Sequence, residues 1–467
     1  MTAGKPPPKA PEHGDREKEK GLWHNDDFLR LWGGETLSQV GSQISLIALP
    51  LTAITLLDAG AGMVGLLATA QYAPVLLVSP LAGHWFDTRP CRPTLAATNF
   101  GRALLMGVIP LSWALGFLSV PLLLAVAFAT GALTAVFDIG YVSYLPRLVP
   151  PRQLTSANAR LESTYSIAGA GGPGLGGLLV QALGPAGAVI ADSASYLVAG
   201  GLNLGIRHRE TRPPREKGVS PWPAVREGMA FLARHPVLRP VLLQSAAFNL
   251  LGQVTFTLFL LYGVQSLHLT SGTLGVVLSV SCLGGLLGAA VAGRVGRRLG
   301  TGRAIVWSMA VGSLSLTAIP AAHGRAPVAV AVLVLGLIVH ELGLGLFNVH
   351  SLTLRARLIP AELLGRVTAG WRLVSTGSIA LNGLLAGVLG ELLGVRTALA
   401  VATGTLAVSC VAFLFSSVRT VSVEGPAEPE EDDPAVSGKG PAADASAAPG
   451  TVDGPDELTG GQPWTRG

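Results

Sequence analysis

The sequence predicts an all-α integral membrane protein with twelve transmembrane helices in two pseudo-symmetric six-helix halves. Three observations carry this prediction: few charged residues, a series of long apolar runs, and an internal repeat. Of the 467 residues only 13% are charged, and the mean hydropathy is +0.50. Soluble domains carry roughly 25% charged residues. The composition therefore excludes a soluble globular protein, and the high apolar content excludes a disordered chain.

The apolar runs are each long enough to cross a bilayer, which takes about 20 residues per helix. The first six lie at 31–57, 63–83, 94–117, 120–144, 156–182 and 184–206, and the second six at 237–266, 273–293, 304–322, 327–350, 365–392 and 395–418. The predicted regions are an N-terminal tail, a first half, a linker, a second half and an acidic disordered tail, at 1–27, 28–206, 207–236, 237–418 and 419–467.

The positions of Lys and Arg predict the orientation, because these residues collect in cytoplasmic loops. With the N-terminus inside, every Lys and Arg except Arg325 and Arg396 lies on or near the cytoplasmic side. Both termini are then cytoplasmic, in the inner (cell) membrane. Within the linker, Val225, Met229 and Leu232 share one helical face, which suits either a short helix on the anionic membrane surface or a plain solvated linker.

The charge and cysteine patterns exclude other classes of protein. The basic residues fall in short patches between apolar runs, so no nucleic-acid-binding face is predicted. Three scattered cysteines indicate neither a disulfide framework nor a metal site. No phosphate-binding loop is present, so we expect no ATP and no cofactor. The string 172–177 satisfies G-x-G-x-x-G, but it lies within a membrane helix and predicts no dinucleotide fold.

The internal repeat has an offset of 210 residues. Arg147-Leu148-Val149-Pro150 recurs as Arg357-Leu358-Ile359-Pro360, and Phe137-Asp138-Ile139 aligns with Phe347-Asn348-Val349 at the same offset. Two halves of equal topology place a substrate site at their interface, near the membrane midplane, and allow alternating access by rocking of the halves.

The loop after the second span resembles the cytoplasmic motif G-x-x-x-D-R-x-G-R-R of the major facilitator superfamily. The matching or charge-conserving positions are Gly83, Asp87, Arg89 and Arg92, whereas Thr88, Pro90 and Cys91 depart from it. The resemblance implies a latch in which the acid pairs with a neighbouring Arg and faces a helix N-terminus on the inner side. A solvated loop is the alternative.

The fifth span is similar to the G-P-x-x-G-G motif of superfamily antiporters. Its matching residues are Gly172, Pro173, Gly176 and Gly177. Glycine allows close helix approach and proline bends the helix, so we expect a seam against Gly284, Gly288 and Ala292 of the eighth span. Generic glycine-rich packing is the alternative. The stretches 144–150 and 156–162 resemble the branch that contains macrolide-type efflux proteins and enterobactin exporters.

Ionisable residues at membrane depth predict functional positions in the first half. Glu35, Gln39 and Gln43 are spaced by four and share one face, which we expect to line the cavity. Glu35 is then a proton-coupling residue, or alternatively an interfacial anchor. Asp138 is a further proton-coupling candidate, although an ion pair with Arg102, Arg89 or Arg92 is the favoured interpretation.

In the second half His340 and Glu341 are adjacent, so only one is expected to point at the cavity, and Glu341 is the favoured proton site. A zinc protease is excluded because position 344 is leucine. Asn249 and Gln253 are further cavity candidates. For the other intramembrane charges we expect satisfaction within the core, with an ion pair between Glu162 and Arg372 as an alternative; these charges are Arg160, Glu162, Asp192 and Arg372.

The sequence thus predicts a proton-coupled exporter of a small amphiphilic compound such as an antibiotic, drug or siderophore, as in multidrug resistance. Its partners are the small-molecule substrate, protons and the lipid bilayer, and the chain is expected to be a monomer without nucleic acid or metal. An importer or facilitator of a polar metabolite is the alternative. A membrane enzyme or a scaffold is more remote, because no nucleophile cluster or extended soluble surface is present.

Overall fold

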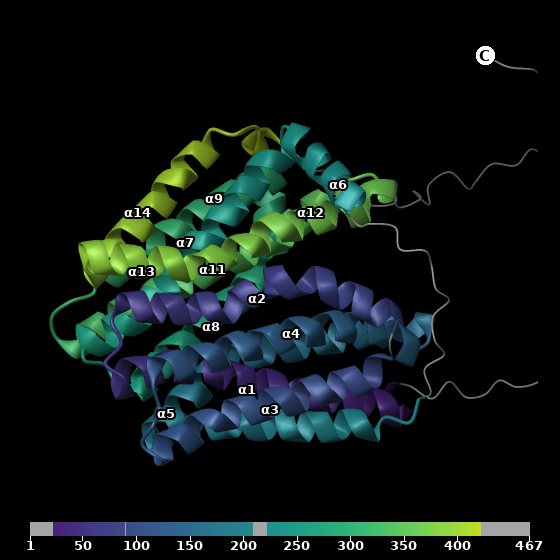
Figure 1. Ribbon diagram of the computed structural model, residues 1–467. Coiled ribbons are helices and arrows are strands. Elements are labelled where there is room, and N and C mark those ends of the chain that lie inside the picture. Colours follow the sequence, from purple (N-terminus) through teal and green to yellow (C-terminus); the bar gives the residue numbers. More distant parts are fainter. Residues whose placement is uncertain (1–21, 89, 209–221, 422–467) are drawn as a thin grey trace, which may run out of the picture. The chain divides into compact units, whose positions relative to one another are not determined.

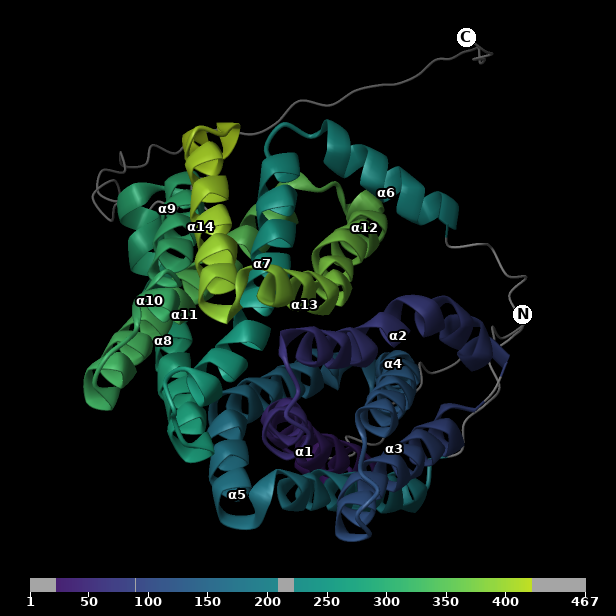
Figure 2. The same cartoon turned by 60° about the vertical axis from the view of Figure 1, so that its left-hand side comes forward.

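The computed structural model describes residues 22–88, 90–208 and 222–421, and this part of the chain is helical without a β-strand. The helices of the N-terminal half are α1 (Asp26–Leu56), α2 (Ala61–Thr88), α3 (Cys91–Ala114), α4 (Val120–Leu148) and α5 (Leu154–Gly205). After the linker helix α6 (Trp222–Arg234), the C-terminal half contains α7 (Leu238–Gln265), α8 (Ser271–Leu299), α9 (Thr301–Ser315), α10 (Ala318–Ala321), α11 (Ala326–Leu358), α12 (Leu364–Gly377), α13 (Asn382–Leu393) and α14 (Val395–Leu414). Figures 1 and 2 show that α1–α5 and α7–α14 gather in two groups.

The described chain supplies 11 helices that are long and apolar enough to cross a membrane. One of them, Pro151–Gly205, has 55 residues, far more than one crossing requires. It is interrupted at Gly184, whose φ of 77° lies outside the helical region. Glycine has no Cβ and adopts this conformation at no steric cost, so one helix can end and the next begin at this position. The all-helical architecture is confirmed, and α5 contains both the fifth and the sixth crossing.

The internal repeat is also present in the backbone geometry. Gly394 lies 210 residues after Gly184 and has the same φ of 77°. Asp58 and His268 are separated by the same offset, and they are the non-glycine residues with positive φ in the described chain. Positive φ is uncommon outside glycine, so two matched sites indicate equivalent turns. The two halves therefore share a local backbone plan as well as a sequence pattern.

The repeat also sets how the first helix of each half begins. The Asn25 side chain accepts a hydrogen bond from the backbone N–H of Phe28 at 3.1 Å. His235, 210 residues later, accepts at Nδ1 from the N–H groups of Val237 and Leu238, both at 3.2 Å. Both side chains satisfy donors that a helix start leaves free. Burial lowers the pKa of His235, which favours the neutral imidazole that this cap requires.

The linker helix α6 packs against α12. Gly228 lies against the backbone carbonyl of Arg366, and Leu232 is fully buried. The Glu227 carboxylate pairs with the Arg366 guanidinium at 2.5 Å. The apolar face that the sequence predicts is thus occupied by protein contacts. The predicted tails at 1–27 and 419–467 lie almost entirely outside the described residues.

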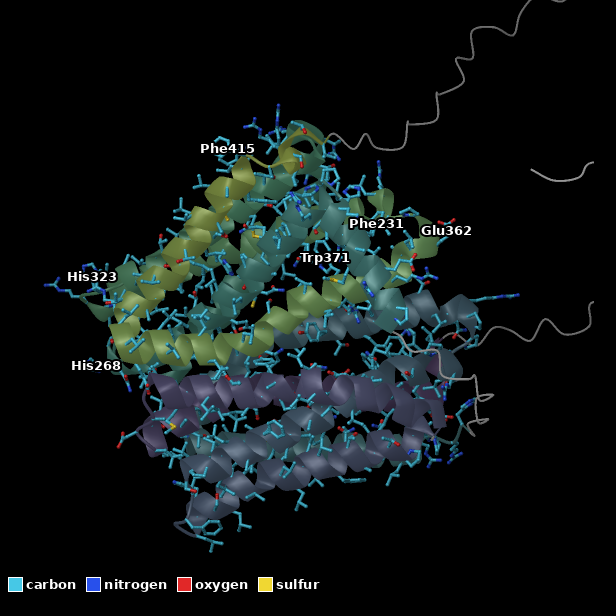
Figure 3. The ribbon with its side chains drawn as sticks, turned by 45° about the horizontal axis from the view of Figure 1, so that its top comes forward. Phe231, His268, His323, Glu362, Trp371 and Phe415 are labelled. Atoms are coloured by element: carbon cyan, nitrogen blue, oxygen red, sulfur yellow. The ribbon has the colours of Figure 1, made fainter. Side chains whose placement is uncertain are left out.

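Figure 3 places His268 and His323 at one end of the helix bundle and Glu362 at the other. His323 and Glu362 flank α11 and both are exposed. Because α11 crosses the predicted membrane once, the two positions belong on opposite sides.

We predict that, in a variant lacking Cys91, Cys282 and Cys410, a cysteine at His323→Cys reacts with a membrane-impermeant maleimide in intact cells. A cysteine at Glu362→Cys should react only after permeabilisation, because the Lys and Arg distribution puts that end inside. Mass-shift labelling on gels measures both. The reverse pattern would overturn the orientation.

Candidate functional site

Glu35 on α1 lies in a buried polar cluster of the N-terminal half. Its side chain is 9% exposed, and its Oε1 accepts a hydrogen bond from Gln39 Nε2 at 2.7 Å. Its Oε2 is buried and has no hydrogen-bond partner among the described residues. The predicted shared face of Glu35 and Gln39 is therefore present. An interfacial anchor would keep its carboxylate in water, whereas the carboxylate of Glu35 is buried.

Arg102 on α3 is the central cation of the cluster. Its guanidinium carbon lies 4.3 Å from the Phe137 ring centroid and 4.4 Å from that of Tyr196, and it donates a hydrogen bond to Asn99. Its charge acts on three carboxyl groups, those of Glu35, Asp138 and Asp192. An aromatic pair on either side of a desolvated guanidinium stabilises it by cation–π attraction. Sequence reasoning missed this role because the aromatic partners come from other helices.

The predicted ion pair of Asp138 with Arg102 is wrong for the described chain. No Arg102 nitrogen lies within 4 Å of that carboxylate, because the guanidinium is held between the two rings. Asp138 is solvent-accessible on α4. Arg89 lies outside the described residues. Arg92 donates to the backbone carbonyl of Leu204.

The other intramembrane charges are satisfied to different extents. Asp192 is 1% exposed and accepts hydrogen bonds from Ser45 and Ser195. Arg160 stacks over Trp23 at 4.3 Å, but its buried Nη1 has no hydrogen-bond partner among the described residues. Glu162 and Arg372 are exposed and form no ion pair with each other. The prediction of core satisfaction is therefore correct for Asp192, met only in part for Arg160, and wrong for Glu162 and Arg372.

A cavity of about 200 Å³ lies between the two halves. Gln43 on α1 and Pro173 on α5 line it from one half. Cys282 on α8, with His340 and Glu341 on α11, lines it from the other. Both residues of the adjacent pair contribute to the wall.

His340 is held in place by two contacts. Its Nδ1 lies 2.9 Å from the Gly312 carbonyl, and its ring stacks on Phe248 with centroids 5.2 Å apart. Among the described residues, Glu341 has no hydrogen bond of this kind. The carboxyl group is therefore the side chain of the two that is free to act on a molecule in the cavity.

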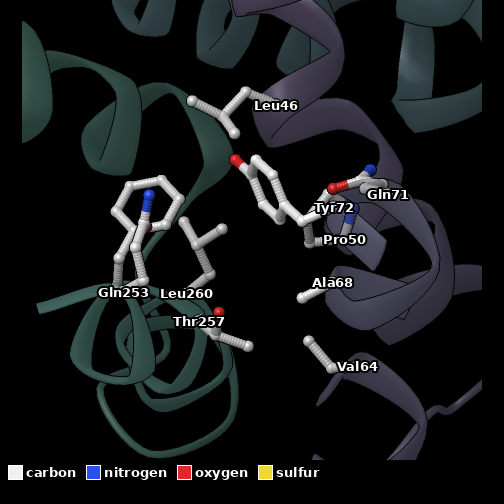
Figure 4. Close-up of a pocket in the computed structure, with 10 residues that line it drawn as sticks. Leu46, Pro50, Val64, Ala68, Gln71, Tyr72, Gln253, Thr257 and Leu260 are labelled. Carbon is white, nitrogen blue, oxygen red and sulfur yellow. The ribbon is translucent and has the colours of Figure 1, made fainter. Parts of the chain in front are cut away.

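The remaining polar candidates lie in separate places. Gln253 contributes to a small pocket with Gln71, Tyr72 and Pro50, where α1 and α2 meet α7 (Figure 4). Asn249 donates from Nδ2 to the Ser375 carbonyl at 2.8 Å and lines a cavity inside the C-terminal half. The predicted cavity residues Gln43, Gln253 and Asn249 therefore line three different cavities.

The glycine-proline string on α5 packs against α8 of the other half. A Cβ on Gly177 would stand 2.4 Å from the Ser271 carbonyl oxygen and 2.8 Å from Gly275 Cα, both backbone atoms. Pro173 has no N–H, so the Gly169 carbonyl loses its helical donor, and the Cys282 thiol lies 3.7 Å from that oxygen. Gly177 of the string thus contacts the other half, whereas Gly172 and Gly176 pack against Gln43 and Ile44 of α1 in the same half.

A second seam repeats this geometry between α13 and α2. A Cβ on Gly383 would stand 2.1 Å from the Gly65 carbonyl oxygen, and one on Gly65 would stand 2.7 Å from Gly387 N. Gly65, Gly383 and Gly387 lie 210 residues from Gly275, Pro173 and Gly177 respectively. The halves are therefore joined by two related backbone contacts.

The predicted seam partners on α8 are wrong. A Cβ on Gly284 would meet the Ile338 carbonyl at 2.0 Å, and one on Gly288 would meet the Leu342 carbonyl at 2.3 Å. Both contacts are to α11 in the same half, because these glycines lie on the face of α8 turned away from α5. Of the cytoplasmic loop motif, Gly83 and Asp87 lie on the last turns of α2, where side chains are not described.

Comparisons with known proteins match this architecture. A family model described as transmembrane secretion effector matches residues 23–437. The uncharacterized MFS-type transporter y4rN of Sinorhizobium fredii is 26% identical over 361 residues, 76% of this chain and 86% of that protein. The uncharacterized MFS-type transporter YfiS of Bacillus subtilis is 23% identical over 387 residues, 81% of this chain and 91% of that protein.

Solved structures of low identity share the fold. A point mutant of the nucleoside transporter NupG has a TM-score of 0.68 at 13% identity, over 83% of this chain and 99% of that chain. An inward-facing bacterial homologue of the iron transporter ferroportin has a TM-score of 0.64 at 19% identity, over 83% of this chain and 98% of that chain.

We predict that Gly177→Val and Gly383→Val each destabilise the protein by about 1–3 kcal/mol, because backbone atoms cannot move aside for the added methyl groups. The matched controls are Gly171→Val and Gly404→Val, positions where a Cβ meets nothing within 4 Å. Thermal unfolding in detergent, followed by intrinsic fluorescence, measures the difference. Equal midpoints for seam and control variants would show that the seams do not hold the halves together.

Proposed function

The chain belongs to the transmembrane secretion effector family of major facilitator transporters, and on that premise we propose that it exports a small amphiphilic compound in exchange for protons. The substrate would occupy the cavity between the halves, and rocking of the halves would expose that cavity to each side in turn. A transporter of this kind requires no catalytic residue and no cofactor.

The observation that carries the proposal is the Glu341 carboxyl group in the wall of the cavity that both halves line. A carboxyl group in such a position can take up a proton from one side and release it to the other as access alternates. Glu35 is the second proton-coupling residue that we propose. Glu35 lies near the charges of Arg102 and Asp138 inside one half, so a change in its protonation changes the net charge of this cluster.

The lining of the cavity favours an amphiphilic substrate over a polar metabolite. Seven of the 16 lining residues are leucine, isoleucine or phenylalanine, including Phe256, Phe259 and Leu337, and glycine, proline and cysteine supply four more. Five lining residues are polar, among them Gln43 and Glu341. Mostly apolar pockets with a few placed polar groups are typical of small-molecule sites. An importer of a polar metabolite is therefore the less favoured alternative.

The glycine string supports exchange between two states. In the predicted orientation, the N-terminal ends of α2 and α8 lie on the external side, so both seams would close that side. Because the seams are made of backbone contacts, they can separate and re-form without moving long side chains. On the cytoplasmic side, Asp87, Arg89 and Arg92 would provide the opposing latch.

We predict that Glu341→Gln and Glu35→Gln remove uphill transport while keeping substrate binding, since each change preserves shape and removes only titration. At least one of them should lower pH-gradient-driven accumulation of a fluorescent amphiphile in proteoliposomes by about tenfold. Downhill exchange should persist. Glu362→Gln, at an exposed position outside the cavity, is the control.

Three further results are informative. If both variants still concentrate the substrate in a pH-dependent way, neither residue carries the proton, and Asp138→Asn becomes the next variant to test. If the wild-type protein transports without regard to the pH gradient, proton coupling is wrong. Net inward movement of the same probe under that gradient would favour the importer.

A further inference from the structure

A separate cavity of about 190 Å³ lies within the C-terminal half, between α7, α9, α11 and α12. Its lining includes apolar and aromatic side chains, among them Phe248, Met309 and Trp371. It also includes polar and cationic side chains, among them Ser351 and Arg355. No acidic side chain lines the cavity. A space of this size equals the liquid volume of about six water molecules, enough for a small polar group and the first part of an apolar body.

The Arg355 guanidinium is held over the aromatic ring of Trp371. Its guanidinium carbon lies 4.4 Å from the Trp371 ring centroid, and its Nε donates to the Ser351 backbone carbonyl at 3.3 Å. Trp371, also labelled in Figure 3, is 7% exposed. Stacking and this single hydrogen bond fix the direction of the guanidinium and leave its terminal N–H groups for another acceptor.

The positive charge of Arg355 has no carboxylate partner. Among the residues whose side chains the structure describes, no Asp or Glu oxygen lies within 4 Å of it. A half-buried cation without an anion is costly, and cation–π stacking offsets only about 1–2 kcal/mol of that cost. The missing counter-charge is therefore expected from a molecule in the cavity.

The Ser351 hydroxyl gives a second, independent indication. Ser351 is 2% exposed and lines the cavity, and its Oγ has no hydrogen-bond partner in the described chain. Buried hydroxyl groups are almost always hydrogen-bonded, so an unpartnered one facing a cavity points to a ligand. It lies one helical turn before Arg355 on α11, so both groups can reach one acceptor.

Two helices, α7 and α11, line both this cavity and the one between the halves. On α11, Leu337 and Glu341 line the interhalf cavity, and Asn348, Ser351 and Arg355 line this one. Their spacing by three and four places them on a single face. The Phe248 ring, which lines this cavity, stacks on His340, which lines the cavity between the halves.

We propose that the Arg355 cavity binds the acidic oxyanion, a carboxylate or phosphate, of the amphiphilic molecule that this protein exports. The assignment rests on the proposed function, because it names the class of substrate. Arg355 and Ser351 hold the oxyanion, and Trp371 and Phe248 contact the adjoining apolar body. Since Arg355 lies near the C-terminal end of α11, which is predicted to be cytoplasmic, the site is the first binding position on the way to Glu341.

Three dansyl probes that differ in charge test the proposal by fluorescence titration of the purified protein in detergent. The probes are dansylglycine, with a carboxylate; dansylamide, neutral; and dansylcadaverine, cationic. The wild-type protein should bind dansylglycine about tenfold more tightly than dansylamide, the effect of one charge-assisted pair. Arg355→Gln should remove that preference and leave dansylamide binding unchanged. Ser351→Ala should weaken dansylglycine about threefold.

Arg357→Gln is the matched control, because it removes the same charge from the same helix at an exposed position that does not line the cavity. The proposal is overturned if wild-type protein shows no preference for dansylglycine, if Arg355→Gln weakens all three probes equally, or if Arg357→Gln has the same effect. Unchanged dansylamide binding also shows that the variants are folded.

An anionic headgroup from the inner leaflet has the same chemistry as a substrate. Short-chain phosphatidylglycerol is therefore added against dansylglycine, with short-chain phosphatidylcholine as the comparison. Displacement by the anionic lipid alone would assign the cavity to lipid and overturn the substrate proposal. Failure of pH-gradient-driven transport with dansylglycine binding intact would instead contradict the proposed function and leave the binding site standing.

Discussion

The close approach of backbone to backbone at two glycine seams is the contact on which the arrangement of the halves depends. At each seam a Cβ would stand less than 3 Å from a carbonyl oxygen of the facing helix, at Gly177 against Ser271 and at Gly383 against Gly65. Lipid tails are as apolar as leucine, so burial of large side chains supplies little force between helices in a membrane. Close van der Waals contact between small residues supplies it instead. The seam at Gly177 consequently decides which face of α5 remains for the cavity.

Charged side chains inside the helix bundle cost free energy, because they leave water for a medium of low polarity. The N-terminal half does so by holding Arg102 between Phe137 and Tyr196 and by giving Asp192 hydroxyl donors from Ser45 and Ser195. Glu35 is treated differently, with a single donor for two oxygens. A structural carboxylate is normally supplied with donors on both oxygens. Glu35 has a hydrogen-bond donor on only one of its two oxygens, which fits a carboxyl group that gains and loses a proton during the proposed transport cycle.

The architecture could be predicted from the sequence because it depends on patterns that are local or periodic. Apolar length gave the crossings, and the 210-residue offset that aligns Arg147 with Arg357 also relates Gly184 to Gly394 in backbone geometry. The site could be predicted only in part. Glu35 and Gln39 share a face because helical spacing requires it, whereas the seam partner of Gly177 depends on the rotation of α8. Sequence spacing does not determine that rotation, so Gly284 was assigned to the wrong neighbour.

The chemistry lies where the two halves differ. The seam glycines have small-residue or proline counterparts at the 210-residue offset, but Arg102 corresponds to Gly312, Glu341 to Gly131 and Arg355 to Leu145. A scaffold that must rock symmetrically gains from equal seams. In the proposed exchange the proton and the substrate need different chemical groups, and these residues stand at positions where the halves differ. The two halves therefore share the geometry of the seams. They differ in the charge cluster around Arg102 in the N-terminal half and in the α11 face from Arg355 to Glu341 in the C-terminal half.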